Sequence, residues 1–240
     1  MAAGVDIWAV DTGAVGPDQV VRMATWLTAD EAARGRRYVR ARDRDAFVVT
    51  RALVRTTLSR YGPTAPRDWR FVTNAHQCPF VIDAQAGAPP LRFNVSHTDG
   101  LVVLAVVRGH DVGVDVEAVS RQVLDEVPER YFAPAEVAAL RALPAADQPR
   151  AFFDYWTLKE AYIKARGLGL AIPLDRFAFT LAADRAPAIA FADGFDDRAE
   201  RWQFRQAWPT PTHRLALAVS RTGDDLPVTL RHLAAADLLP

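Results

Sequence analysis

The only two lysines of this 240-residue chain, Lys159 and Lys164, flank one glutamate, Glu160, within the segment FFDYWTLKEAYIKARGLGL. A lysine is a compact point charge whose pKa shifts readily, whereas an arginine is a planar group that stays charged. This use of lysine indicates contact with a phosphate oxygen or a proton transfer close to Glu160. The alternative is an ordinary Glu160–Lys164 pair on a helix, which stabilises the helix by about 0.2–0.5 kcal/mol.

Two more acids end the apolar segment VGVDVE, which covers residues 112–117. If this segment is a strand, Asp115 and Glu117 point to the same face because they are two residues apart. Two carboxylates on one face repel each other unless a cation or protons relieve them. With Glu160 as a third carboxylate, the set predicts an oxygen-rich site suited to Mg²⁺. The alternative is a solvated strand end with two surface acids.

A third candidate is the segment FNVSH, which ends with Ser96 and His97 where an apolar strand is expected to turn. Together with Asn94, these side chains offer clustered hydrogen-bond donors for a phosphate. A lone histidine is more often structural than functional. The arginine-rich residues 34–44 offer further phosphate contacts, although a solvated basic face explains most of those arginines equally well.

The elements that must position these residues can be predicted from hydrophobic periodicity and from turn and capping residues. In the first part of the chain we expect a strand at 5–10, a helix opened by the capping box Thr28–Glu31, a long helix at 43–60, a strand at 69–73 and a hairpin at 91–107. In the second part we expect a strand at 112–116, a helix from Pro134, a long helix at 152–166, a strand at 176–181 and a hairpin at 202–219.

The same order of elements occurs twice, and RLALAVSR near the end of the second series resembles LVVLAVVR in the first. We therefore predict an α+β fold with two similar halves, residues 1–109 and 110–225, followed by a tail at 226–240. We expect pseudo-twofold symmetry and an active site in the cleft between the halves, because such interfaces are favoured ligand sites. The alternative is a chance likeness of two mixed segments.

Composition excludes several classes of partner and site. The net charge is zero, so no global field attracts nucleic acid or an anionic membrane. No apolar run approaches the ~18 residues of a membrane helix, and the N-terminus lacks the features of a signal peptide. A single cysteine, Cys78, excludes an internal disulfide and fits a reducing compartment. We expect a cytoplasmic monomer.

Taken together, VGVDVE, FNVSH and FFDYWTLKEAYIKARGLGL resemble the three sequence blocks of the 4′-phosphopantetheinyl transferases of the Sfp type. The third block follows the family pattern of Trp or Phe, then Ser, Thr or Cys, any residue, Lys-Glu-Ala, two residues and Lys. It does so at Trp156, Thr157, Leu158, Lys159, Glu160, Ala161 and Lys164. The order and spacing of the blocks also agree, and the resemblance covers about residues 5 to 220.

This resemblance implies transfer of the phosphopantetheine arm of coenzyme A to a serine of an acyl or peptidyl carrier protein, with release of 3′,5′-ADP. By matched position, the Mg²⁺ ligands are Asp115, Glu117 and Glu160, and the catalytic residues are Glu160, Lys164 and Asp115. Glu160 is the expected base for the serine, and Lys164 contacts the coenzyme A phosphates. The remaining expected contacts with coenzyme A are Arg42, Asn94, Ser96, His97 and Lys159, of which all but Lys159 are matched to the adenosine 3′-phosphate.

One departure from the family pattern is Gln77-Cys78-Pro79, where many members have Gly-Lys-Pro. It puts one phosphate or adenine contact in doubt, but not the reaction. Two other functions stay open: a coenzyme A-binding module without activity, and a metal-dependent hydrolase that cleaves the pyrophosphate without a carrier. The sequence leaves open whether the carrier serves fatty acid, polyketide or nonribosomal peptide assembly.

Overall fold

The computed structural model describes residues 4–76, 78–120 and 126–240, so Gln77 of the departure noted above lies outside the described residues. The chain divides into two compact units. Unit 1 comprises the chain up to Thr73 together with Pro79–Gly109 and Pro227–Pro240, and unit 2 comprises Asn74–Cys78 and His110–Leu226. Among the described helices, none combines the length and apolar character needed to cross a membrane.

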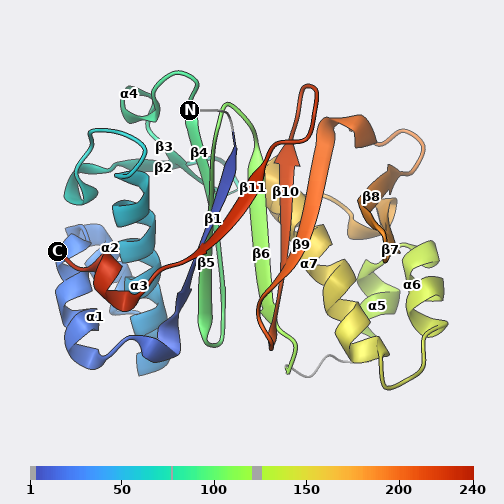
Figure 1. The fold of residues 1–240 in the computed structure, drawn as a ribbon, viewed down its shortest axis with the longest axis horizontal. Helices are drawn as coiled ribbons and strands as arrows, with labels where there is room; N and C mark the ends of the chain where they lie inside the picture. The colour runs from blue at the N-terminus through green and yellow to red at the C-terminus, as the bar shows by residue number, and fades with distance from the viewer. Residues whose placement is uncertain (1–3, 77, 121–125) are drawn as a thin grey trace. The chain divides into compact units, whose positions relative to one another are not determined.

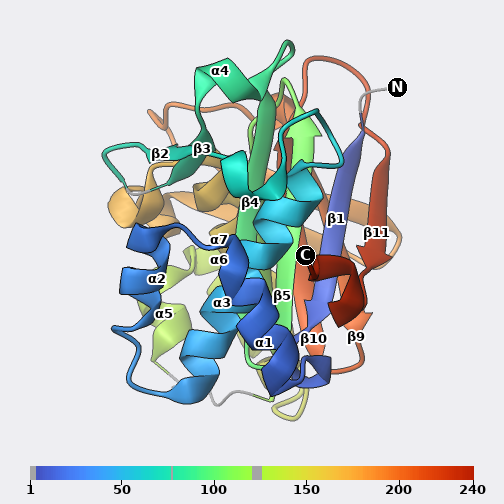
Figure 2. The same ribbon diagram turned by 90° about the vertical axis from the view of Figure 1, so that its left-hand side faces the viewer.

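Unit 1 is a four-stranded sheet with helices on one face (Figures 1 and 2). The sheet has the order β11-β1-β5-β4, and its strands are β1 (Val5–Asp11), β4 (Leu91–Thr98), β5 (Leu101–Arg108) and β11 (Val228–His232). The helices are α1 (Pro17–Met23), α2 (Ala29–Gly35), α3 (Ala41–Leu58) and α4 (Asp83–Ala86). A separate ribbon pairs β2 (Phe71–Thr73) with β3 (Pro79–Val81).

Unit 2 is built in the same way around a three-stranded sheet of order β6-β10-β9. Its strands are β6 (Val112–Ala118), β9 (Trp202–Thr210) and β10 (His213–Ser220), and its ribbon pairs β7 (Phe177–Ala182) with β8 (Arg185–Phe191). The helices are α5 (Val127–Tyr131), α6 (Pro134–Arg141) and α7 (Gln148–Arg166). The long helix α7 packs on β6 and β10, and Gly167 ends it in the left-handed conformation that glycine adopts without strain.

The two units repeat one topology, which confirms the prediction of an α+β chain with two similar halves. β1 pairs with β5 and β5 with β4, as β6 pairs with β10 and β10 with β9, all antiparallel. Leu104 of β5 belongs to the core that contains α3, and Ala216 of β10 belongs to the core that contains α7. Residues 101–108 therefore correspond to residues 213–220. The likeness of LVVLAVVR to RLALAVSR suggested residues 214–221 instead, but a shift of one residue would turn the wrong face of β10 toward α7.

The segment treated as a tail in the sequence, residues 226–240, supplies an additional strand to unit 1. β11 pairs parallel with β1, so that Val5 lies beside Val228 and Ala9 beside His232. The five residues VTLRH carry little hydrophobic signal, since none of them is fully buried. A short strand at the edge of a sheet is therefore hard to distinguish from a loop by sequence pattern.

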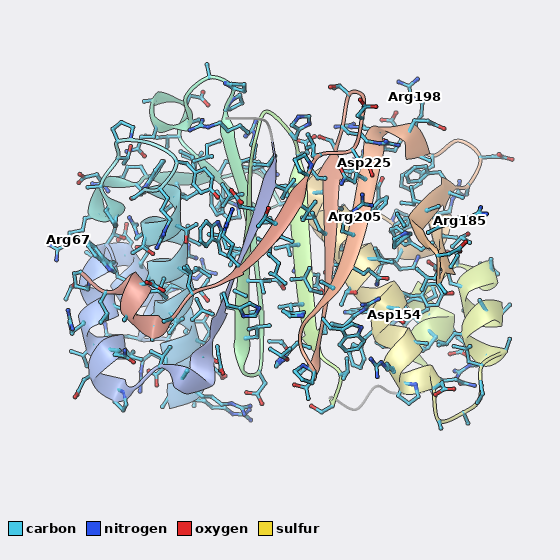
Figure 3. The ribbon with its side chains drawn as sticks, viewed as in Figure 1. Arg67, Asp154, Arg185, Arg198, Arg205 and Asp225 are labelled. Atoms are coloured by element: carbon cyan, nitrogen blue, oxygen red, sulfur yellow. The ribbon has the colours of Figure 1, made fainter. Side chains whose placement is uncertain are left out.

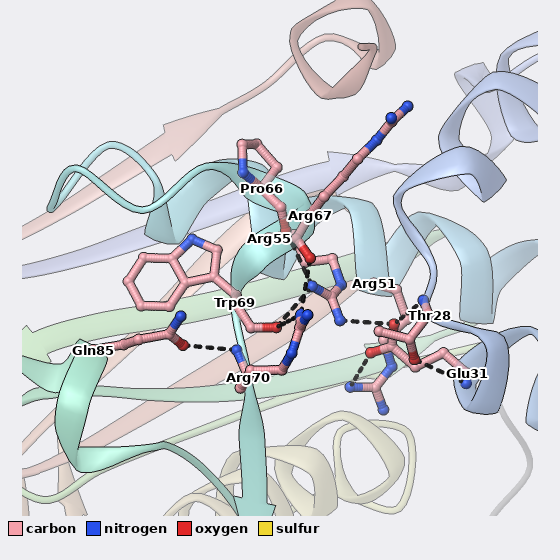
Figure 4. Close-up of polar contacts among 9 residues, drawn as sticks. All are labelled: Thr28, Glu31, Arg51, Arg55, Pro66, Arg67, Trp69, Arg70 and Gln85. Atoms are coloured by element: carbon pink, nitrogen blue, oxygen red, sulfur yellow. Dashed lines mark hydrogen bonds and ion pairs between the residues drawn. The ribbon is translucent and has the colours of Figure 1, made fainter.

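A buried arginine holds together the helices of unit 1 (Figure 4). Arg55 of α3 is 1% exposed. Its Nη2 donates to Glu31 Oε2 at 2.8 Å, and its Nη1 donates to the carbonyls of Pro66 and Trp69, both at 3.0 Å. Glu31 also accepts from the backbone N–H of Thr28 at 3.0 Å, as the predicted capping box requires. Removing either partner would leave a buried charge unpaired, which is strongly destabilising.

In unit 2 the helix α7 approaches the strand β6 so closely that only glycine fits between them. A Cβ atom on Gly113 would overlap the carbonyl oxygen of Ala161 and the amide nitrogen of Ala165. Both are backbone atoms of α7, so no side chain can rotate away to make room. Gly113 is therefore a packing requirement of this unit.

We expect Gly113→Ala to destabilise the protein by about 3 kcal/mol or more. Overpacking a core usually costs about 1–3 kcal/mol, and the cost should reach or exceed the top of that range where rigid backbone atoms block the added methyl group. For a chain of this size, that corresponds to a fall in Tm of at least about 6 °C. Gly62→Ala is the matched control, since a Cβ there would meet no atom within 4 Å. A Tm for Gly113→Ala within about 2 °C of that control would contradict this packing.

Candidate active site

The face of β6 that α7 covers carries both predicted acids. Gly113, Asp115 and Glu117 alternate with valines that point to the opposite face, and Asp115 lies opposite Ala216, which packs against α7. Asp115 is buried, whereas Glu117 at the end of the strand is half-buried. The i,i+2 spacing seen in the sequence thus places two carboxylates beneath one helix.

The helix α7 brings Lys164 directly onto Asp115. The Lys164 ammonium donates to Asp115 Oδ1 at 2.6 Å and to the carbonyl of Val114 at 3.3 Å. The Lys164 side chain as a whole is 27% exposed. Lys164 therefore does more than brace its own helix, because it reaches across to the neighbouring strand and neutralises a buried acid.

Glu160, one turn before Lys164, completes the acidic group. Burial, together with the negative charges of Asp115 and Glu117, raises the pKa of Glu160 from 4.5 to about 7, although the positive charge of Lys164 opposes the shift. The three predicted acids are therefore close enough to act on one another's charge. A carboxyl group that titrates near neutral pH can exchange a proton under physiological conditions.

The donor set of this site suits magnesium, which prefers carboxylate oxygens and retains several waters. Three carboxylates that share one lysine carry excess negative charge, and this charge favours a bound cation. In the arrangement seen here, no three acidic, histidine or cysteine side chains among the described residues converge on one point. The Lys164 ammonium instead lies where a cation would contact Asp115.

Lys159, which was predicted to contact coenzyme A, does not belong to this group. Its ammonium has no exposed surface and lies 2.7 Å from Glu136 Oε2. It also donates to the carbonyls of Leu174 and Phe177 at 2.7 and 2.8 Å, so all three of its protons have acceptors. Although adjacent in sequence, residues 159 and 160 point about 100° apart on the helix.

The residues predicted for the adenosine 3′-phosphate lie in unit 1, where strand alternation separates them. Asn94 and Ser96 are buried on one face of β4, whereas the exposed His97 belongs to the opposite face. Arg42 lies in the first turn of α3 with 63% of its side chain exposed, 3.5 Å from Asp43. The start of α3 and the β4–β5 turn lie at the same end of unit 1 (Figures 1 and 2), so Arg42 and His97 share that end.

An unpredicted ion pair lies beside Glu117. Arg214 of β10 lies directly opposite Glu117 in the ladder, and its Nε is 2.6 Å from Oδ1 of Asp154, which Figure 3 labels on α7. The Trp208 ring contacts both Arg214 and Arg150, at 4.9 and 4.1 Å from its centroid. No sequence pattern indicates this pair, because the register between β6 and β10 is set only by folding.

A cavity of about 480 Å³ in unit 2 lies apart from the acids. It is lined by β8 and β9 residues such as Ile189 and Phe204, and by the ion pair Arg205–Asp225 at 2.8 Å, both members of which are labelled in Figure 3. Neither the β6 acids nor Glu160 lines it. We therefore place the candidate site on β6 and α7.

The raised pKa of Glu160 predicts how stability depends on pH in metal-free protein. Glu160 holds its proton up to about pH 7 when folded but only to about 4.5 when unfolded. Its contribution to stability is therefore complete below about pH 4.5 and is lost as the pH rises through about 7. Wild type should lose about 2–3 kcal/mol relative to Glu160→Gln between pH 4.5 and 8 in urea unfolding with EDTA. Parallel pH profiles for the two proteins would contradict this.

Comparison with known proteins agrees with this division of the chain. A model of the 4′-phosphopantetheinyl transferase N-terminal region matches residues 16–108, and a model of the 4′-phosphopantetheinyl transferase superfamily matches residues 111–219. The 4′-phosphopantetheinyl transferase HetI of Nostoc sp. is 35% identical over 64% of this chain and 65% of its own length. The 4′-phosphopantetheinyl transferase Sfp of Bacillus subtilis is 28% identical over 72% of this chain and 74% of its own.

A phosphopantetheinyl transferase of Thraustochytrium sp. is 29% identical over 98% of this chain and 87% of its own length. The match to HetI spans a little less than two thirds of that protein. The two family models meet at the boundary between units 1 and 2. The chain belongs to the 4′-phosphopantetheinyl transferase family, and its relatives place it with the Sfp-like members.

Proposed function

We propose that this protein transfers the 4′-phosphopantetheine arm of coenzyme A to a serine of an acyl or peptidyl carrier protein, releasing 3′,5′-ADP, with Mg²⁺ as the required cation. The observation that carries the proposal is the group of three carboxylates on β6 and α7, with Lys164 on Asp115, in a chain of this family. The names of the relatives support the same reaction class.

Asp115, Glu117 and Glu160 would hold the metal. When bound, Mg²⁺ supplies charge neutralisation for the pyrophosphate under attack. Glu160 is suited to accept the serine proton, because burial and the neighbouring acids raise its pKa to about 7 in the metal-free protein. Lys164 has a flexible stem and a partly exposed side chain, so its ammonium can turn from Asp115 to a phosphate oxygen.

For the adenosine 3′-phosphate, we propose His97 and Arg42 as contacts, because both are exposed and lie at one end of unit 1. Asn94 and Ser96 face the other side of β4, and so the proposed phosphate contact does not include them. A cytoplasmic location is also part of the proposal, since a chain with the single cysteine Cys78 does not depend on an internal disulfide.

A transfer assay with Asp115→Ala tests the proposal. Wild type with coenzyme A and Mg²⁺ should add the mass of phosphopantetheine to an apo-carrier, with one 3′,5′-ADP per transfer. A carrier with alanine in place of the acceptor serine should stay unmodified. Asp115→Ala should lose at least 100-fold in rate, about 2.7 kcal/mol, because a metal ligand and the partner of Lys164 disappear together.

The exposed acid Asp184, which lies 3.8 Å from Arg185 between β7 and β8, offers a matched control in Asp184→Ala. This variant removes the same charge from the surface and should transfer at the wild-type rate. Release of 3′,5′-ADP at an undiminished rate without any carrier would instead assign the site to pyrophosphate hydrolysis. Full transfer by Asp115→Ala would overturn the metal site.

A further inference from the structure

Each unit contains one buried ion pair between a short helix and the long helix that follows it. In unit 1 the acid is Glu31, whose Oε2 accepts from the N–H of Thr28 at the start of α2. In unit 2 it is Glu136, whose Oε2 accepts from the N–H of Ala133 at the start of α6 and whose Oε1 accepts from the N–H of Phe179. Both acids are the third residue of their helix, so the two positions are equivalent.

The cations are also equivalent. Arg55 and Lys159 each bond to their glutamate and to two backbone carbonyls, which lie in the connection that leads to the ribbon or, for Phe177, at the first residue of the ribbon. Each also lies over the first phenylalanine of that ribbon. Arg55 is 5.3 Å from the centroid of Phe71, and Lys159 Nζ is 4.3 Å from that of Phe177.

The residues beside these cations differ between the units. Lys159 is followed by Glu160, whereas Arg55 is followed by Thr56. In the matching sheet register, Asp115 of β6 corresponds to Trp8 of β1, since Asp115 pairs with Ala216 and Trp8 with Leu104. The contacts agree with this match, because the equivalent of Lys164, Arg60, lies over the Trp8 ring at 5.2 Å.

The acids needed for chemistry therefore occur in unit 2 alone, while the buried pair occurs in both. We propose that the Lys159–Glu136 pair is a positioning device, which fixes the rotation of α7 so that Glu160 and Lys164 face the acids of β6. This inference rests on the proposed function for its kinetic consequence. Lys159 and Glu160 are consecutive residues, so a turn of the helix that releases one side chain displaces the other.

The physical need for such a device follows from the packing of α7. At Gly113 the helix and strand are in backbone contact, and a small rotation there changes which side chains meet β6. Apolar packing specifies rotation weakly, whereas three oxygen acceptors around one buried ammonium specify it strongly. A buried ion pair often adds little net stability, because removing its two charges from water is costly. The role that we infer for this pair is therefore to specify the rotation of α7.

The test compares a matched set of variants in the full chain. Lys159→Met/Glu136→Gln removes the pair in unit 2 without leaving an unpaired buried charge, and Arg55→Met/Glu31→Gln does the same in unit 1. Lys159→Arg is the conservative variant, because unit 1 forms its pair with arginine. The readouts are Tm, Mn²⁺ binding to the metal-free protein measured by electron paramagnetic resonance, and kcat and KM for coenzyme A in transfer.

Both double variants should lower Tm. Only Lys159→Met/Glu136→Gln should also weaken Mn²⁺ binding at least fivefold and reduce kcat at least tenfold, with KM for coenzyme A within twofold of wild type. Lys159→Arg should keep most of the wild-type Mn²⁺ affinity and most of the wild-type kcat. If the unit 2 double variant does not fold, Lys159→Gln/Glu136→Gln, which also leaves no unpaired buried charge, carries the test with the same direction of change.

Wild-type Mn²⁺ affinity and kcat in folded Lys159→Met/Glu136→Gln, or in Lys159→Gln/Glu136→Gln as its replacement, would overturn the inference and leave the pair purely structural. Equal losses of Mn²⁺ affinity in the unit 1 and unit 2 variants would overturn it as well. A wild-type protein that binds Mn²⁺ but transfers no phosphopantetheine would refute the proposed function instead, and the Mn²⁺ comparison would still decide the positioning role.

Discussion

The backbone contact between α7 and β6 at Gly113 is the constraint on which the candidate site depends. It lets the Lys164 ammonium reach the Asp115 carboxylate and keeps Glu160 within range of the charges on β6. In unit 1 the equivalent place is occupied by side chains, where the Tyr61 hydroxyl donates to Asp6 Oδ2 at 2.7 Å. Unit 1 therefore retains the fold without the helix–strand contact that gathers the acids.

The duplication supplies an internal comparison that a single unit could not. Features present in both units, such as the antiparallel register and the pairs Glu31–Arg55 and Glu136–Lys159, belong to the architecture that the two units share. Features present in unit 2 alone, such as Asp115 and Glu160, are then free to serve chemistry. Two adjacent residues of α7 thus have different surroundings: Lys159 is buried against Glu136, whereas Glu160 lies near the acids of β6.

The sequence allowed prediction of the elements and of the acids, because both follow from local periodicity. The i,i+2 spacing of Asp115 and Glu117 needs only a strand to place them on one face. Features that depend on rotation, register or distant pairing could not be predicted. The inward direction of Lys159, the separation of His97 from Asn94, and the parallel pairing of β11 with β1 all depend on contacts that only the folded chain defines.

The most direct measurement of the central claim is anomalous diffraction from crystals of the protein with Mn²⁺ and coenzyme A. The account predicts one manganese per chain, bound by Asp115 and Glu160 on unit 2, with Lys164 moved from Asp115 Oδ1 to a phosphate oxygen. It predicts none at the equivalent position beside Trp8 in unit 1. Manganese bound elsewhere, or Lys164 still bonded to Asp115 beside bound coenzyme A, would contradict it.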